Sequence, residues 1–194
     1  MTYAAVFRPA EKPYAIVYDL VCILGGTLFI ALSAQVSISL PFSPVPITGQ
    51  TLAVLLVGVL LGSHRAGLCL LTYLAEGSIG LPVFAGGKAG IAHLLGPTGG
   101  YLLGFVPAAF LVGWLAERGW DRRATSAFAA MLVGNMVIYI FGLPWLACFV
   151  GMERVMVAGL LPFIPGDLAK IVLATAMLPW GWKLLKRAGV DMPT

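Results

Sequence analysis

LVCILGGTLFIALSAQVSISL, residues 20 to 40, sets the fold class of this chain. The stretch runs for 21 residues without a charged side chain. At 1.5 Å per residue, a helix of this length measures about 31 Å, which matches the ~30 Å hydrocarbon core of a lipid bilayer. The stretch therefore predicts a membrane-spanning helix, and we place the whole span at about residues 15–40.

The composition of the whole chain supports the same prediction. Hydrophobic residues make up 60% of the 194 residues, charged residues only 10%, and the mean hydropathy is +0.96. So few charges cannot cover the surface of a soluble domain of this length, and we infer that the surrounding solvent is lipid. The segment before residue 14 is polar and lacks the pattern of a signal peptide.

Several classes of function are disfavoured by what the sequence lacks. We expect no nucleic-acid binding, because no basic patch is interleaved with aromatic residues. Two isolated histidines are too few for a metal site, and we expect no cofactor. Without a GxxxxGK motif the chain is not expected to hydrolyse ATP. Three cysteines lie singly in apolar runs and form neither a CxxC pair nor a disulfide framework: Cys22, Cys69 and Cys148.

The apolar runs predict an all-α integral membrane protein, a single domain over residues 1–194 with six transmembrane helices. The second and third spans are short, about 21 Å each, because the three prolines of PFSPVPITGQ (41–50) and then Arg65 interrupt the apolar pattern. The spans are placed at about 15–40, 49–62, 66–79, 99–116, 124–150 and 165–183.

The basic residues predict the orientation of these spans. An even number of spans puts both termini on one side, and nine Lys and Arg residues fall on that side against Lys88 and Arg154 on the other. By the positive-inside rule both termini are cytoplasmic. The outer connections 41–48, 80–98 and 151–164 are poor in charge and rich in Pro and Gly. Such irregular backbone near a membrane packs on protein or lines a cavity, so we expect a ligand pocket near the outer face.

The segment PFIPGDLAK, residues 162–170, carries an acid and a base at depth. Asp167 and Lys170 are three residues apart and share one helix face. Measured along the helix from Lys183 at the inner interface, Asp167 lies about 24 Å and Lys170 about 20 Å away. Both are therefore expected in the outer third of the membrane. One interpretation is a helix cap with a neighbouring ion pair. The other is a binding site, because ionisable groups inside a membrane are functional candidates.

Further residues are candidates for the same pocket. Lys88 stands between glycines in GLPVFAGGKAG and is either an exposed loop lysine or a cation folded inward. A ligand with an amide-like edge, an apolar middle and a carboxylate would satisfy these charges. Glu76 has no evident partner and stays unassigned. Other candidates are the aromatic lining Phe42, Phe84, Tyr101 and Phe163, and Asn135 with Tyr139, for which interhelical hydrogen bonding is an equal alternative.

Four motifs carry a resemblance to a known family: PVPITGQTL (44–52), GLPVFAGGKAG (80–90), GPTGGYLLGF (96–105) and PFIPGDLAK (162–170). In this order and spacing they resemble the BioY family of biotin transporters, the substrate-capture (S) components of energy-coupling-factor (ECF) transporters. The resemblance extends over roughly residues 15–187. It implies six membrane helices and a biotin pocket near the outer face, covered by the first outer loop, in the inner membrane of a prokaryote.

The resemblance also implies partners and ligand contacts. Beside biotin and membrane lipid, the partners are a transmembrane coupling protein and a pair of ATP-binding-cassette ATPases, and a homo-oligomer stays open. Asp167, Lys170 and Lys88 are implied as ligand contacts. We expect Asp167 to accept the ureido N–H groups of biotin while Lys88 or Lys170 holds its carboxylate.

Two further features of the resemblance concern the fourth span and the first. The glycines of GPTGGY are expected to let the start of the fourth helix approach the ligand, with Thr98 as helix cap and candidate donor. The docking face of S components commonly carries an alanine, three residues, alanine pattern. Here the nearest matches are small residues, Thr27 with Ala31 and Ser33 with Ser37.

Three alternative functions fit the sequence less well. An intramembrane aspartyl protease is suggested by Tyr18-Asp19 and Gly166-Asp167, but Asp19 is expected at the inner interface, too far from Asp167 to share a proton. An S component for another vitamin would have the same architecture. A channel would need polar residues repeated along several spans, whereas here they concentrate at one end.

Overall fold

The computed structural model describes residues 2–187 of the chain. Most of these residues are helical, and six helices of at least 12 residues form a bundle. The elements are α1 (Tyr3–Val6), α2 (Lys12–Gln35), β1 (Ser37–Leu40), β2 (Ser43–Thr48), α3 (Gln50–Leu61), α4 (Ser63–Ser78), the 3-10 turn η1 (Ala85–Gly87), α5 (Ile91–Leu94), α6 (Gly99–Glu117), α7 (Ala124–Val150), α8 (Val155–Gly159) and α9 (Ile164–Arg187).

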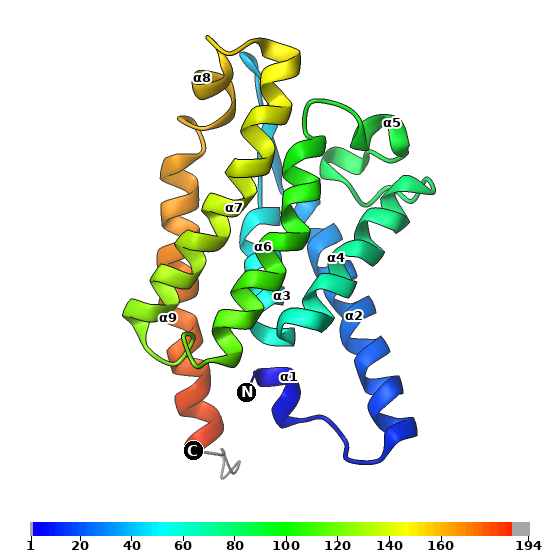
Figure 1. The fold of residues 1–194 in the computed structure, drawn as a ribbon, viewed down its shortest axis with the longest axis vertical. Coiled ribbons are helices and arrows are strands. Elements are labelled where there is room, and N and C mark those ends of the chain that lie inside the picture. Colours follow the sequence, from blue (N-terminus) through cyan, green and yellow to red (C-terminus); the bar gives the residue numbers. More distant parts are fainter. Residues whose placement is uncertain (1, 188–194) are drawn as a thin grey trace.

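Helix α6 forms the centre of the bundle. It packs on α7, α3 and α4, while α9 packs on the far side of α7 and α2 packs on α4 (Figure 1). Helix α1 and the C-terminal end of α9 lie at one end of the molecule (Figure 1). The short helices α5 and α8 lie at the opposite end. The irregular connections 80–98 and 151–163 therefore lie at the same end of the bundle.

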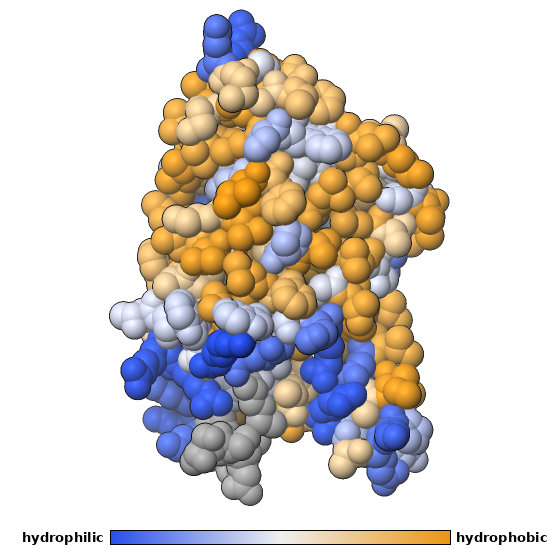
Figure 2. Space-filling view, in the orientation of Figure 1, coloured by the Kyte–Doolittle hydropathy of each residue, from blue (hydrophilic) through white to orange (hydrophobic). Residues whose placement is uncertain are grey.

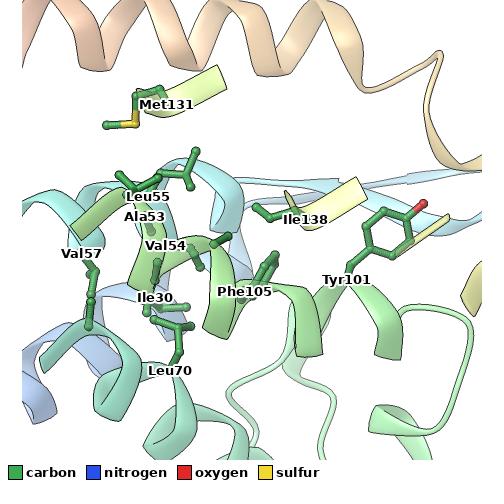
Figure 3. Packing of buried hydrophobic residues seen from close by; sticks show 14 of the residues in the cluster. Ile30, Ala53, Val54, Leu55, Val57, Leu70, Tyr101, Phe105, Met131 and Ile138 are labelled. Atoms are coloured by element: carbon green, nitrogen blue, oxygen red, sulfur yellow. The ribbon is translucent and has the colours of Figure 1, made fainter. Parts of the chain in front are cut away.

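The core is apolar and closely packed. All six long helices contribute side chains to it, among them Ile30 of α2, Val54 of α3, Leu70 of α4, Phe105 of α6 and Ile138 of α7 (Figure 3). Small residues allow this closeness, because association of helices in lipid depends on van der Waals packing rather than on the hydrophobic effect.

Helices α3 and α6 are in close contact in the core. A Cβ added at Gly58 would lie 2.8 Å from the carbonyl oxygen of Ala109, and one at Gly113 would lie 2.6 Å from the backbone of Gly62. Glycine is therefore required at both positions for this helix spacing.

The outside of the bundle is suited to lipid. Along α2, Leu20, Leu24, Leu28 and Leu32 form a stripe at i, i+4 spacing with each side chain more than half exposed. In the view of Figure 2, the middle of the molecule is apolar, and a hydrophilic zone lies at the end that carries α1. In the described part of the chain, four segments are long and apolar enough to span a membrane: Lys12–Gln35, Gly99–Glu117, Ala124–Val150 and Val155–Arg187. The protein is thus a multi-pass membrane protein.

The first predicted span ends earlier than the apolar run does. Helix α2 stops at Gln35, and a two-stranded antiparallel hairpin follows, with Ser37 paired to Thr48 and Leu40 to Ser43. The alternation in VSISL and its β-branched residues favour a strand, and Pro41 follows directly. The prediction of helix up to residue 40 was therefore wrong, and the fold is mostly helical rather than purely so.

The third helix begins earlier than predicted. Arg65 does not interrupt it but lies in the first turn of α4, where its Nε is 2.7 Å from the Asp19 carboxylate. The Glu117 carboxylate accepts hydrogen bonds from the Ser63 backbone N–H at 2.7 Å and from the Ser63 hydroxyl at 2.9 Å. A negative charge at a helix N-terminus is favourable, so α4 starts at Ser63.

Candidate ligand-binding site

A cavity lies at the end of the bundle that carries the hairpin and α5. It has about 670 Å³ of empty space, part of which is open to solvent. Its polar lining comes from the hairpin, the 80–98 connection and helices α3, α6, α7 and α9: Thr48, Gln50, Thr51, Lys88, His93, Thr98, Tyr101, Tyr139, Asp167 and Lys170. Its apolar lining is Val45, Pro46, Ala85, Leu102, Phe105, Ile138 and Phe163.

Asp167 is the buried acid of this cavity, with only 5% of its surface exposed. One carboxylate oxygen, Oδ1, accepts hydrogen bonds from the Thr51 hydroxyl and the Lys170 ammonium, each at 3.2 Å. The other oxygen, Oδ2, accepts one from the Tyr139 hydroxyl. These donors come from α3, α7 and α9, so the carboxylate joins three helices. A buried charge is costly unless it is paired and hydrogen-bonded, and all three partners lower that cost.

The ammonium of Lys170 has no donor to spare. It donates to the Thr48 carbonyl at 2.7 Å, to the Thr51 hydroxyl at 2.9 Å and to Asp167 at 3.2 Å. A lysine ammonium has three donors, and each has an acceptor here. Because Thr48 is the last residue of β2, Lys170 ties the end of the hairpin to α9.

Lys88 reaches the cavity from the connection between α4 and α6. Gly86, Gly87 and Gly90 around it have φ of +69°, +71° and +90°, a conformation that favours glycine. The backbone N–H of Phe84 donates to the Lys88 carbonyl at 3.0 Å, which closes this loop on itself. Lys88 is largely exposed and lines the cavity. The loop therefore presents an exposed cation at the cavity wall, which agrees in part with each of the two interpretations from sequence.

Two tyrosines form an aromatic wall. The rings of Tyr101 on α6 and Tyr139 on α7 meet edge to face, with centroids 6.2 Å apart and an interplanar angle of 84°. Their hydroxyls point to different partners, since Tyr139 donates to Asp167 and Tyr101 donates to the Gly159 carbonyl at 2.9 Å. Tyr101 thus lines the cavity with its ring and holds α8 with its hydroxyl.

Gln50 is a lining residue that sequence reasoning did not single out. It is buried, and its Nε2 donates to the Tyr73 hydroxyl at 2.7 Å, which in turn donates to the Val83 carbonyl at 2.9 Å. The Thr48 hydroxyl donates to Gln50 Oε1 at 3.2 Å. This chain of bonds joins the hairpin, α3, α4 and the 80–98 connection. The only signal in the sequence was the position of Gln50 within PVPITGQTL.

His93 is the second lining residue that sequence reasoning passed over, having considered it only as a metal ligand. Its ring packs on Phe84 with centroids 5.3 Å apart, and its Nε2 lies 3.4 Å from the Thr98 hydroxyl. Burial, and then the charge of Lys88, lower the pKa of His93 below its usual value. No group of three or more potential metal ligands occurs within residues 2–187.

The structure brings five of the seven predicted ligand residues to the cavity: Asp167, Lys170, Lys88, Thr98 and Tyr101. Phe84 is not in the lining. It is fully buried behind it, against Tyr73 and His93, and Gly77 leaves room for its ring. An apolar ring in a loop can either line a pocket or anchor the loop to the core, and the ring of Phe84 anchors the 80–98 connection.

Asn135 also lies outside the main cavity. It borders a small neighbouring space together with Thr51, Asp167 and Lys170. Its Oδ1 is buried without a hydrogen-bond partner among the described residues. Tyr139, one helical turn further along α7, is the residue that reaches the cavity, so the two residues of this face have different surroundings.

The glycines of GPTGGY do not approach the cavity as expected. A Cβ at Gly100 would lie 2.3 Å from the Trp145 Cβ, and one at Gly99 would lie 1.8 Å from the Leu94 carbonyl oxygen. These glycines therefore bring α6 close to α7 and to α5. Thr98 occupies the N-cap position of α6, but its side chain makes no capping hydrogen bond and faces His93 instead.

The predicted docking residues face the interior. Thr27 is 3% exposed, and its hydroxyl donates to the Leu24 carbonyl at 3.0 Å and lies 3.2 Å from Glu76 on α4. Ala31 is partly buried against the core. Small residues on α2 thus permit close approach of α4 within the chain, and Thr27 with Ala31 do not form a free docking face. The same contact gives Glu76, left unassigned from sequence, a partner.

Asp19 and Asp167 do not form a dyad. The Asp19 carboxylate is held by Arg8 and Arg65, each at 2.7 Å, in the half of α2 nearer α1. Asp167 lies in the cavity at the other end of the bundle. Two carboxylates that share a proton must be close together, so this arrangement does not support the protease alternative.

Known proteins resemble this chain in sequence and in structure. The BioY family is matched over residues 7–187. A probable biotin transporter BioY of Pyrococcus horikoshii is 45% identical over 150 residues, which are 76% of this chain and 87% of that protein. A biotin transporter BioY of Rhizobium etli is 39% identical over 162 residues, or 79% of this chain and 87% of that one. A crystal structure of the S-component for biotin from an ECF-type ABC transporter has a TM-score of 0.78 and 28% identity, and the match covers 90% of this chain and 95% of that one.

Proposed function

This chain belongs to the BioY family, and on that basis we propose that it captures biotin for uptake as the S component of an ECF transporter. The observation that carries the proposal is the combination of groups in the cavity. It offers a buried carboxylate, an aromatic and aliphatic wall, and a lysine on a loop. Biotin has matching parts: ureido N–H donors, an apolar ring and chain, and a terminal carboxylate.

Asp167 is proposed to accept a ureido N–H group. A carboxylate has about four lone-pair sites, and Thr51, Lys170 and Tyr139 use three of them. One site is left for a ligand donor. The bond would be charge-assisted, and such bonds are roughly twice as strong as neutral ones.

Lys88 is proposed to hold the carboxylate of the ligand. Of the two lysines in the cavity, Lys170 already has an acceptor for each of its three donors. Among the described residues, no side-chain hydrogen bond or ion pair of Lys88 occurs, and its ammonium is available. The 80–98 connection and α9 lie on opposite sides of α6 (Figure 1), which suits a ligand that has its two polar ends apart.

The orientation proposed is that of the positive-inside rule, with the α1 end of the bundle in the cytoplasm and the cavity near the outer face of the cytoplasmic membrane of a prokaryote. All six long helices would then cross the membrane. Helices α3 and α4 have only 12 and 16 residues, so the hairpin and the 80–98 connection would complete their passage. The hydrophilic zone at the α1 end in Figure 2 supports this orientation.

Energy for uptake is proposed to come from partner proteins. The chain carries no GxxxxGK motif for ATP phosphates, and its relatives are named as transporters rather than as enzymes. The partners of an S component would be a transmembrane coupling protein and a pair of ATPases. The cavity would load outside, and the partners would drive release inside.

Equilibrium binding tests the proposal. Radiolabelled biotin is titrated against the purified chain in detergent, and unlabelled biotin, thiamine and riboflavin compete in parallel. We expect saturable binding that only biotin displaces at equimolar concentration. Displacement by thiamine or riboflavin instead would retain the capture architecture and reject biotin as its ligand.

A further inference from the structure

His93 lies where a ligand held by Lys88 would reach. Both residues line the cavity, and both belong to the connection between α4 and α6. The histidine ring is held in place on one side by Phe84, which is fully buried, with ring centroids 5.3 Å apart. Its Nε2 lies 3.4 Å from the Thr98 hydroxyl at the start of α6. The imidazole is therefore positioned by its neighbours rather than free in solvent.

Among residues 2–187, the charges around His93 include no anionic partner for it in the ligand-free cavity. On its own connection the nearby charge is the cation Lys88, which together with burial lowers the pKa of His93. From α6 it faces the neutral Thr98. Across the cavity, Asp167 is already bonded to Lys170, and the remaining lining groups Tyr101, Tyr139 and Gln50 are neutral. Glu76 of α4 is bonded to Thr27 and does not line the cavity.

We propose that His93 is a second contact for the carboxylate of the ligand, and that it takes up a proton when the ligand binds beside Lys88. This proposal rests on the proposed function, because the carboxylate of biotin supplies the missing anion. An opposite charge nearby favours the imidazolium form, and a protonated imidazole donates from both nitrogens. Proton uptake would therefore turn a neutral wall residue into a second cation of the carboxylate subsite.

The pH dependence of binding follows from this coupling. In the empty protein, burial and the charge of Lys88 lower the pKa of His93, which favours its neutral form. In the complex the ligand carboxylate raises that pKa, and the complex then holds more protons than the empty protein between the two pKa values. Affinity must rise as pH falls through this interval and level off on either side. A free carboxyl group titrates near pH ~4.3, so the ligand stays ionised above about pH 5.5.

The test is isothermal titration of the full chain with biotin at pH 5.5, 6.5 and 8.0, in pairs of buffers that differ in ionisation enthalpy. Each unit by which the ligand raises the pKa of His93 corresponds to a tenfold change in affinity across the interval. We expect biotin to bind about three- to tenfold more tightly at pH 5.5 than at pH 8.0. The buffer pairs should show net proton uptake. Biotinamide, which lacks the negative charge, should bind without this pH dependence.

Matched variants assign the effect to His93. The chain has two histidines, and the other one, His64, lies on α4 against Ser63 and Phe110, away from the cavity lining. His64→Gln should retain the pH dependence, and His93→Gln should abolish it. His93→Arg, which carries a fixed charge, should also bind independently of pH. It serves as a second variant in case glutamine disturbs the packing on Phe84.

The outcomes separate this inference from the proposed function. Biotin binding that does not vary with pH, or a pH dependence that survives both His93 substitutions, would overturn the role of His93 and leave biotin capture intact. Absence of biotin binding by the unaltered chain at every pH would reject the proposed function itself.

Discussion

The ammonium of Lys170 lies 2.7 Å from the carbonyl oxygen of Thr48, so the first turns of α9 hold the end of the β hairpin. The same ammonium contacts Asp167 and Thr51. The acid of the cavity and the hairpin beside it are thus fixed by one side chain. A ligand that contacts Asp167 would therefore bind at a site in which α9 and the hairpin are already joined.

Lys170→Met should destabilise the fold as well as the site. It removes three hydrogen bonds and leaves the buried carboxylate of Asp167 with less compensation. We expect a loss of roughly 1.5–3 kcal/mol in the free energy of unfolding, the range for bonds to charged groups, and weaker biotin binding. Thermal unfolding in detergent measures the first effect and ligand titration the second. An unchanged unfolding temperature would show that Lys170 does not hold the hairpin.

Lys88→Met should separate binding from stability. Lys88 is largely exposed on its loop, so the unfolding temperature should stay within error. Biotin should bind about fivefold more weakly or worse, because roughly 1 kcal/mol or more of ion pairing with its carboxylate is lost. Biotinamide should bind both proteins alike. Equal weakening for biotin and biotinamide would mean that Lys88 acts on the site by some route other than the carboxylate.

Tyr139→Phe should weaken binding through Asp167. The substitution keeps the ring that lines the cavity and removes the donor to Oδ2. Because the Asp167 carboxylate then loses one of its hydrogen-bond donors, we expect about fivefold lower biotin affinity. This factor is equivalent to about 1 kcal/mol, the usual contribution of one hydrogen bond. Tyr101→Phe is the matched control, since its hydroxyl bonds to Gly159 instead. That control should lower stability and spare affinity, and the reverse ranking would contradict the assignment.

Gly100→Ala should disturb the packing of α6 on α7. The added methyl group would meet the Trp145 Cβ at 2.3 Å and the Phe141 carbonyl oxygen at 2.6 Å. We expect a loss of about 1–3 kcal/mol in stability, the usual cost of overpacking. Gly166→Ala is the control, because a Cβ there meets nothing within 4 Å. If both variants unfold at the temperature of the unaltered chain, the contact between α6 and α7 is looser than the structure indicates.

Sequence reasoning succeeded where the determining pattern lies within one element. Lipid as the solvent followed from composition. The spacing of three placed Asp167 and Lys170 on one helix face, and an ion pair between them was one of two interpretations. The structure shows that pair at 3.2 Å. The presence of Lys88 at the cavity wall was one of two alternatives, because a loop between glycines has no periodicity that fixes its direction.

Sequence reasoning failed where packing between elements decides the outcome. Phe84, in the 80–98 connection, is buried because Gly77 of α4 leaves room for its ring. Thr27 looked like a docking residue, yet it faces Glu76 across the contact of α2 with α4. Gln50 and His93 became visible as lining residues only when α3, α5 and α6 were brought together. The hairpin is the exception, since the alternation in VSISL was present in the sequence and the apolar run concealed it.

The most direct test of biotin capture at this site is the dissociation constant of biotin for the unaltered chain beside Asp167→Asn. The substitution keeps the shape of the side chain and removes the charge that Thr51, Lys170, Tyr139 and the ligand share. Loss of charge-assisted hydrogen bonding should cost roughly 1–3 kcal/mol, or about five- to 150-fold in affinity. A variant that stays folded and binds biotin as tightly as the unaltered chain would contradict the assignment of Asp167 as the ligand acceptor.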